Sequence, residues 1–224
     1  MMENKKFFDI NSNDTNLRKQ NNFKERHKDD FNMKNKLFKL WDTIKPAIIV
    51  GIIVFCVFKL IILNGFIPSE SMEPTLLTSN FVIANRLAYK SNPPQRGDVV
   101  VIDSKEYEEL IVKRVIGLPG DEIELKNDKV YINGCLLDES KYAVGETKIL
   151  VPGHDTFNVP DNCIFVMGDN REHSSDARYW DNSYISYDDV VGKVVLEYSI
   201  GGDDGFYIKK INSLQPKFIG DENK

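Results

Sequence analysis

The sequence is poor in cysteine, with three among 224 residues. This excludes the disulfide framework that stabilises many small secreted domains. One bridge is conceivable, between Cys135 and Cys163, because Cys56 lies in an apolar run. The redox state of that pair is left open by the sequence.

The chain also lacks several motifs of metal and nucleotide chemistry. It contains no HExxH, no CxxC pair and no glycine-rich phosphate loop, so no metal site and no cofactor is predicted. The segment GGDDG at 201–205 is interpreted as a turn, with a calcium site as the alternative. A Ser-His-Asp triad is not indicated either, because G-x-S-x-G is missing and His27, His154 and His173 stand in no triad context.

Positive charge is in deficit, with 29 Lys and Arg against 34 Asp and Glu, a net charge of −5. This balance argues against a nucleic-acid-binding protein. Residues 1–45 nevertheless carry 11 basic and 7 acidic side chains, which leaves 18 basic and 27 acidic for residues 46–224. The two parts are therefore expected to face different surroundings, and a chain of this length holds one domain with an appendage.

Between these parts lies Pro46–Leu63, 18 residues with a single charge at Lys59. As a helix the run would span about 27 Å, enough for the hydrocarbon layer of a bilayer. A buried core helix and a cleavable signal peptide are the alternatives. We interpret residues 46–63 as an uncleaved transmembrane anchor, because about 45 residues precede the run and LNGFIPS offers no small-x-small exit.

Lysines gather just before the apolar run, at Lys28, Lys34, Lys36, Lys39 and Lys45. The positive-inside rule then places residues 1–45 in the cytoplasm as a basic leader, and residues 64–224 outside as the folded domain. The leader is rich in Asn and Lys and lacks sustained periodicity, so it is predicted to be largely disordered.

Beyond Pro68 the pattern is one of short apolar strands broken by turns. The Asn133-Gly134 pair predicts a two-residue hairpin, and Ser186 predicts the cap of a short helical turn. The tail FYIKKI could return to the domain or to the membrane surface. We expect a mainly β domain of coiled antiparallel sheets preceded by one transmembrane helix, without parallel βαβ units.

Two residues, a lysine in a predicted strand and a serine in a turn, could supply chemistry together. Strand alternation places Lys113 between Ile111 and Val115 on one face, where loss of solvent would lower the pKa of its amine, provided that carboxylates stay away. Ser71 lies in a stretch neither helical nor strand-like, which holds its hydroxyl outward. A neutral amine beside a hydroxyl forms a base and nucleophile pair without histidine. Taken singly, an edge-strand Lys and a turn Ser remain the alternative interpretation.

At this point the residues resemble those of type I signal peptidases, the membrane-anchored serine proteases that remove signal peptides from exported proteins. SESMEPTL at 69–76 is similar to the nucleophile box and KRVIGLPGDEIEL at 113–125 to the lysine box. RGDVVV at 96–101 and GDNREHSSDAR at 168–178 are similar to the two remaining boxes, in family order. The resemblance covers residues 46–198 and is closest to the minimal single-anchor type.

The resemblance implies a role for each matching residue. Ser71 would be the nucleophile and Lys113 the general base, Ser69 would donate a hydrogen bond to the oxyanion, and Ser174 would orient the lysine amine. The structural support would come from Asp169, Arg171, Asp176 and Arg178. The resemblance also implies shallow pockets for small substrate residues. The candidates for their walls, with plain core as the alternative, are Ile67, Pro68, Met72, Leu76 and Val112.

The implied activity is removal of signal peptides after Ala-x-Ala at the outer surface of the membrane. The expected partners are signal peptides of exported preproteins and the lipid bilayer, with no nucleic acid, while the oligomeric state is left open. Glu70 stands where many relatives carry Gly, and Ala177 replaces a more usual Ser. These departures remove no reacting group, but they motivate the alternative of a non-catalytic, membrane-tethered binding module. A related alternative is self-cleavage, as in the SOS-response repressors, which share the Ser/Lys chemistry. Those proteins need a DNA-binding headpiece, and here an anchor stands in its place.

Overall fold

A computed structural model describes residues 5–148, 153, 155–201, 205–214 and 217–219, with side chains from residue 33 onward. The side chain of His27 is not described, and His154 and residues 202–204 of GGDDG lie outside the described residues. The predictions for these positions stay predictions. The chain divides into two units, Met1–Val57 and Phe58–Lys224. Each unit is considered by itself below.

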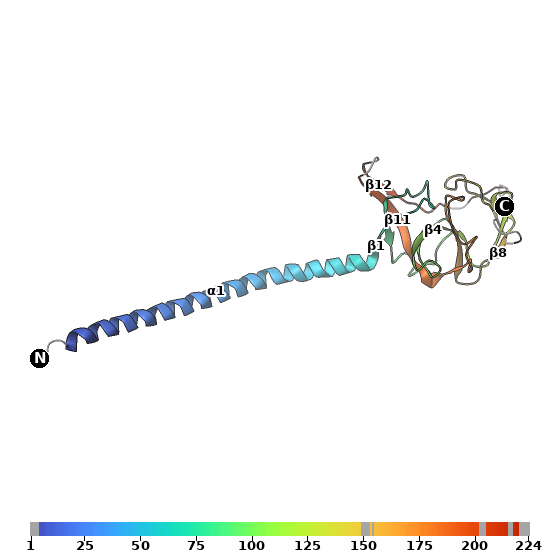
Figure 1. The fold of residues 1–224 in the computed structure, drawn as a ribbon. Coiled ribbons are helices and arrows are strands. Elements are labelled where there is room, and N and C mark those ends of the chain that lie inside the picture. The colour runs from blue at the N-terminus through green and yellow to red at the C-terminus, as the bar shows by residue number, and fades with distance from the viewer. Residues whose placement is uncertain (1–4, 149–152, 154, 202–204, 215–216, 220–224) are drawn as a thin grey trace. The chain divides into compact units, whose positions relative to one another are not determined.

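The first unit is formed by the helix α1, which spans Lys5–Ile61 and whose last four residues, 58–61, belong to the second unit (Figure 1). Residues 1–45 were predicted to form a largely disordered leader. In the structure residues 5–45 are part of the helix instead. A physical reason is that residues 1–45 contain no glycine and no proline, so nothing in the backbone interrupts the helix. Within α1, Met33–Ile61 is long and apolar enough to cross a membrane. The division into leader and anchor at residue 45 stays a prediction.

The second unit consists of two antiparallel sheets, which confirms the predicted mainly β fold. The first sheet has the strand order β1-β2-β11-β3-β4-β9-β10, with β12 paired to β11. Its strands are β1 Ile62–Phe66, β2 Phe81–Asn85, β3 Val99–Ser104, β4 Glu109–Gly117, β9 Cys163–Met167, β10 Ile185–Ser186, β11 Val190–Ile200 and β12 Phe206–Lys210. The second sheet, ordered β13-β7-β6-β5-β8, consists of β5 Glu122–Lys126, β6 Lys129–Ile132, β7 Cys135–Asp138, β8 Thr156–Asn158 and β13 Lys217–Ile219.

Local signals in the sequence explain several of these elements. Asn133 and Gly134 both have positive φ, 51° and 78°, and form the two-residue turn between β6 and β7. The hydroxyl of Ser186 accepts a hydrogen bond from the Asp188 N–H and caps the 3-10 turn η1, Tyr187–Asp189. Of the two alternatives for the tail, the structure favours a return to the domain, because β12 pairs with β11.

Apolar side chains form two buried clusters. The larger joins the two sheets and includes the ring pair of Phe157 and Phe165, whose centroids are 4.7 Å apart. The smaller lies against the first sheet and includes Ile67, Met72 and Leu76, residues that flank Ser71. The turn that carries Ser71 is therefore fixed by core packing on both sides.

Candidate active site

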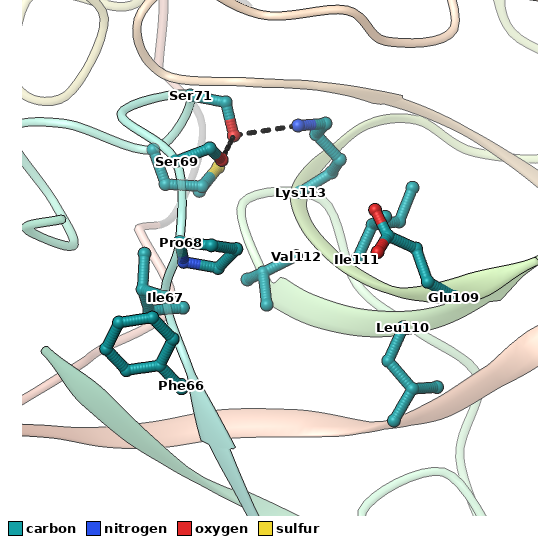
Figure 2. A pocket seen from close by; sticks show the side chains of 11 residues that line it. Phe66, Ile67, Pro68, Ser69, Ser71, Glu109, Leu110, Ile111, Val112 and Lys113 are labelled. Carbon is teal, nitrogen blue, oxygen red and sulfur yellow. Dashed lines mark hydrogen bonds between the residues drawn. The ribbon is translucent and has the colours of Figure 1, made fainter. Parts of the chain in front are cut away.

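Two segments far apart in the sequence meet at Ser71 and Lys113. Lys113 is the fifth residue of β4 and pairs with Val100 of β3, while Ser71 lies in the turn region between β1 and β2. Figure 2 shows the two side chains pointing toward one another. The Lys113 Nζ is 2.8 Å from the Ser71 Oγ. This is hydrogen-bond distance, so a proton can pass directly between the two side chains.

The Lys113 side chain is removed from water. Lys113 is 6% exposed and Ser71 is 7% exposed. Burial disfavours the ammonium form and lowers the pKa of Lys113 from 10.5 to about 8. A substantial fraction of the amine is therefore neutral in mildly alkaline solution.

The carboxylates of Asp176 and Asp169 lie near the Lys113 amine, and both stabilise its ammonium form. The expected lowering of the pKa had assumed that no carboxylate would lie nearby. Each carboxylate is already paired with an arginine. Asp176 Oδ1 accepts from Arg178 Nε at 2.7 Å, and Asp169 Oδ2 accepts from Arg114 at 2.6 Å. Because these pairs compensate the negative charge, desolvation remains the dominant influence on the pKa of Lys113.

One further hydroxyl lies close to the Ser71 hydroxyl, and another lies beside Gly168, next to the Ser71 carbonyl oxygen. The Ser69 Oγ is 3.3 Å from the Ser71 Oγ. The Ser174 Oγ donates to Asp176 Oδ2 at 2.7 Å and makes no hydrogen bond to Lys113, so its orienting role stays a prediction. Gly168 permits this proximity, since a Cβ there would lie 2.2 Å from Ser174 Oγ and 2.5 Å from the Ser71 carbonyl oxygen.

The four residues expected to give structural support all form ion pairs, but two of them pair with residues outside that set. Asp176 and Arg178 pair with each other, whereas Asp169 pairs with Arg114. Arg171 pairs with Glu139, to which its Nη1 donates at 2.8 Å. Arg114 and Glu139 were missed because their partners lie 55 and 32 residues away, and no local pattern reports such pairing.

A cavity of about 310 Å³ opens beside the two catalytic candidates (Figure 2). Of the five predicted wall residues, the structure places four on it, Ile67, Pro68, Met72 and Val112. Leu76 is wholly buried in the smaller core cluster and does not line the cavity, a correction to the prediction. The wall residues that the prediction did not include are Phe66, Glu109, Leu110 and Ile111. Because every second residue of a strand faces the same side, Ile111 and Glu109 could have been predicted from their spacing to Lys113.

Both walls of the cavity present open strand edges. β1 is the terminal strand of the first sheet. β4 pairs with β3 along residues 109–114, but on its other edge it pairs with β9 only along residues 114–117. Among the described strands, nothing pairs with the second edge of residues 109–113. An extended peptide could therefore hydrogen-bond to the backbone on both walls.

The remaining candidates of the sequence analysis lie outside this arrangement. His173 is half exposed and contacts Glu70, with 3.0 Å between Nδ1 and Oε1. All three cysteines are free, Cys135 and Cys163 included. Within the described residues no group of three or more His, Cys, Asp and Glu could hold a metal ion.

Comparison with known proteins identifies relatives of this chain. The family model described as signal peptidase, peptidase S26, matches residues 40–199. Signal peptidase I of Bacillus caldolyticus is 36% identical over 175 residues, which cover 74% of this chain and 92% of that protein. The probable signal peptidase I-2 of a Synechocystis species is 34% identical, covering 59% of this chain and 61% of that protein. A crystal structure of a signal peptidase I from Enterococcus faecalis aligns with 45% of this chain and 95% of its own, at 32% identity and a TM-score of 0.36.

Proposed function

The chain belongs to the signal peptidase family, peptidase S26, and on this premise we propose that it removes signal peptides from exported preproteins with a Ser71 nucleophile and a Lys113 base. The observation that carries the proposal is the 2.8 Å separation of Lys113 Nζ and Ser71 Oγ at a buried site. A lysine is a useful base near neutral pH only where its pKa is depressed, and here the pKa is lowered to about 8.

The chemistry follows from the protons of these two groups. The neutral Lys113 amine accepts the hydroxyl proton as Ser71 Oγ attacks the scissile carbonyl carbon. The resulting ammonium then protonates the leaving amine, the peptide C–N bond breaks, and an ester to Ser71 remains. Water, deprotonated by the same amine, hydrolyses the ester and regenerates the hydroxyl.

The negative charge on the carbonyl oxygen needs hydrogen-bond donors. We propose two donors, the Ser69 hydroxyl and the backbone N–H of Ser71. Support for Ser69 comes from its distance of 3.3 Å to the nucleophile oxygen. Donors positioned in advance toward that oxygen are worth about 10²–10³ in rate.

The substrate would bind as an extended strand between β4 and the segment after β1, with its scissile bond at the Ser71 end of the cavity. We propose that the apolar wall residues Ile67, Met72 and Val112 leave shallow space beside Ser71, which lines the same cavity. Such space accepts small side chains and rejects large ones. We therefore expect cleavage after Ala-x-Ala.

The site is tied closely to the apolar helix. Ser71 follows the last residue of α1, Ile61, by ten residues, so even a fully extended connection reaches only about 33 Å. With Met33–Ile61 in the bilayer and the N-terminus in the cytoplasm, Ser71 would act at the outer membrane surface. Signal peptides are held at the same surface by their own apolar segment.

The direct test uses the full chain in detergent with a preprotein carrying an Ala-x-Ala site. Ser71→Ala and Lys113→Ala should each reduce kcat/KM by at least about 10³-fold. Lys126→Ala, at an exposed lysine on β5, is the matched control and should leave the rate unchanged. An acylating penem should add its mass to Ser71 in the unaltered chain and not in Ser71→Ala. No cleavage and no adduct at any pH would instead support the non-catalytic binding module.

A further inference from the structure

A second cavity, of about 260 Å³, lies beside the turn that follows Ser71 and is lined by basic side chains. Four of its residues are cationic, namely Arg114, Lys141, Lys209 and Lys210. Thr75 and Asn212 add polar groups, and no acidic residue lines the cavity within the described part of the chain. This concentration of positive charge contrasts with the 27 acidic and 18 basic residues of 46–224.

Two of the four cations have carboxylate partners. Arg114 is paired with Asp169, and Lys209 Nζ lies 3.4 Å from Glu197 Oε2. The other two, Lys141 and Lys210, form no ion pair with any described residue, and both are exposed. Lys141 feels the carboxylate of Asp138 at longer range, as the lowered pKa of Asp138 shows, although the main cause of that lowering is a hydrogen bond from Ser140. The cavity therefore carries an excess of about two positive charges.

The walls also offer hydrogen-bond donors. The Thr75 hydroxyl oxygen accepts from Arg114 Nη2 at 3.1 Å, which leaves its own proton free to donate. Lys209 is already engaged, because it donates to the Thr75 carbonyl at 2.8 Å and to the Pro74 carbonyl at 3.3 Å and lies 3.4 Å from Glu197 Oε2. The free ammonium donors are therefore those of Lys141 and Lys210. Charge and donors together suit a ligand that is an oxyanion.

We infer that this cavity binds a phosphate group. Lysine ammonium groups serve as point charges for phosphate, and an excess of two cations matches a phosphate monoanion or dianion. The phosphate could be inorganic phosphate or the headgroup of an anionic phospholipid, since both present the same oxygens. Lys209, Lys210 and Asn212 lie beyond residues 40–199, so part of the wall of this cavity comes from outside the segment that matches the family.

A bound phosphate would link elements that are distant in the sequence. Lys141 follows β7 of the second sheet, Lys209 and Lys210 end β12, and Thr75 lies four residues after Ser71. A ligand that binds only the folded chain also stabilises it by mass action. Binding is independent of the proposed catalysis, and Ser71→Ala should bind phosphate with unchanged affinity.

The test is equilibrium dialysis of the full chain, in neutral detergent at fixed ionic strength, against radiolabelled inorganic phosphate. We expect one saturable site per chain. Lys141→Gln and Lys210→Gln should each weaken binding about three- to tenfold, as expected for loss of one partly exposed charge contact. Lys129→Gln, which neutralises an exposed lysine on β6, is the matched control and should not change the affinity.

Competition separates the two sources of the phosphate. If the ligand is a headgroup, dihexanoyl phosphatidylglycerol below its micellar concentration should displace the label at lower concentration than glycerol phosphate does. Equal displacement by the two would identify free phosphate chemistry, which also supports the site. Absence of saturable binding, equal weakening by Lys129→Gln, or displacement by acetate at the same concentration would each overturn the inference.

Discussion

Lys113 and Arg114 are neighbours on β4, yet their cationic groups meet opposite environments. Arg114 donates to both oxygens of Asp169, at 2.7 and 2.6 Å, and its charge is compensated. Lys113 contacts no carboxylate among the described residues, and its Nζ lies 2.8 Å from Ser71 Oγ. The strand thus carries a structural cation and a potential base side by side, because alternate residues face opposite sides of a sheet.

Burial of Lys113 should reduce the stability of the fold at neutral pH. Its pKa falls from 10.5 to about 8 on folding, so the unfolded chain binds more protons between these values and stability rises with pH across that window. At pH 7, Lys113→Met should therefore increase the free energy of unfolding by up to about 3 kcal/mol. The gain should disappear as the pH approaches 10.5. Denaturant titrations of the full chain in detergent at pH 7 and pH 10 measure it, and a gain that is equal at both would contradict the assignment.

Asp169 should be one of the most sensitive positions for stability. Asp169→Asn leaves the Arg114 guanidinium, 1% exposed, without its anion and should cost about 3–5 kcal/mol of unfolding free energy. Glu124→Gln removes the partner of Lys126 in an exposed pair and should cost less than about 1 kcal/mol. Denaturant midpoints of the two variants measure their losses of unfolding free energy. Comparable losses would contradict the claim that burial makes the Arg114–Asp169 pair more important for stability than an exposed pair.

Val112 offers a test of the cavity as the substrate pocket. It lines the cavity and is only partly buried, so Val112→Ala should enlarge the space with little change in folding. The ratio of kcat/KM for a Val-x-Ala site to that for an Ala-x-Ala site should rise about tenfold, the effect of one or two methyl groups. Val130, buried in the larger core, provides the control. Val130→Ala should lower stability and leave that ratio unchanged.

The β elements were predictable because their signals are local. The Asn133-Gly134 turn and the Ser186 cap depend on residues adjacent in the sequence, and both appear in the structure as predicted. The burial of Lys113 also follows a local rule, since apolar residues flank it on its face of β4. The family resemblance then joined Lys113 to Ser71, a pairing that strand periodicity alone does not contain.

Other features depend on distant residues and were not predictable. Arg114 finds Asp169 across 55 residues, and Glu197 accepts a hydrogen bond from the Leu77 N–H across 120 residues. Leu76 was a candidate pocket wall with plain core as the alternative, and the turn directs it into the core. The helix over 5–45 was missed because its composition resembles that of unfolded chains, although no residue in it breaks a helix.

The most direct test of the account is the pH dependence of kcat/KM on a preprotein, measured from pH 5 to pH 10 with the full chain in detergent. With a pKa of about 8 for Lys113, the rate should rise tenfold for each pH unit up to about pH 7 and level off above about pH 9, as the amine becomes neutral. A rate that stays constant down to pH 5 would contradict a Lys113 general base.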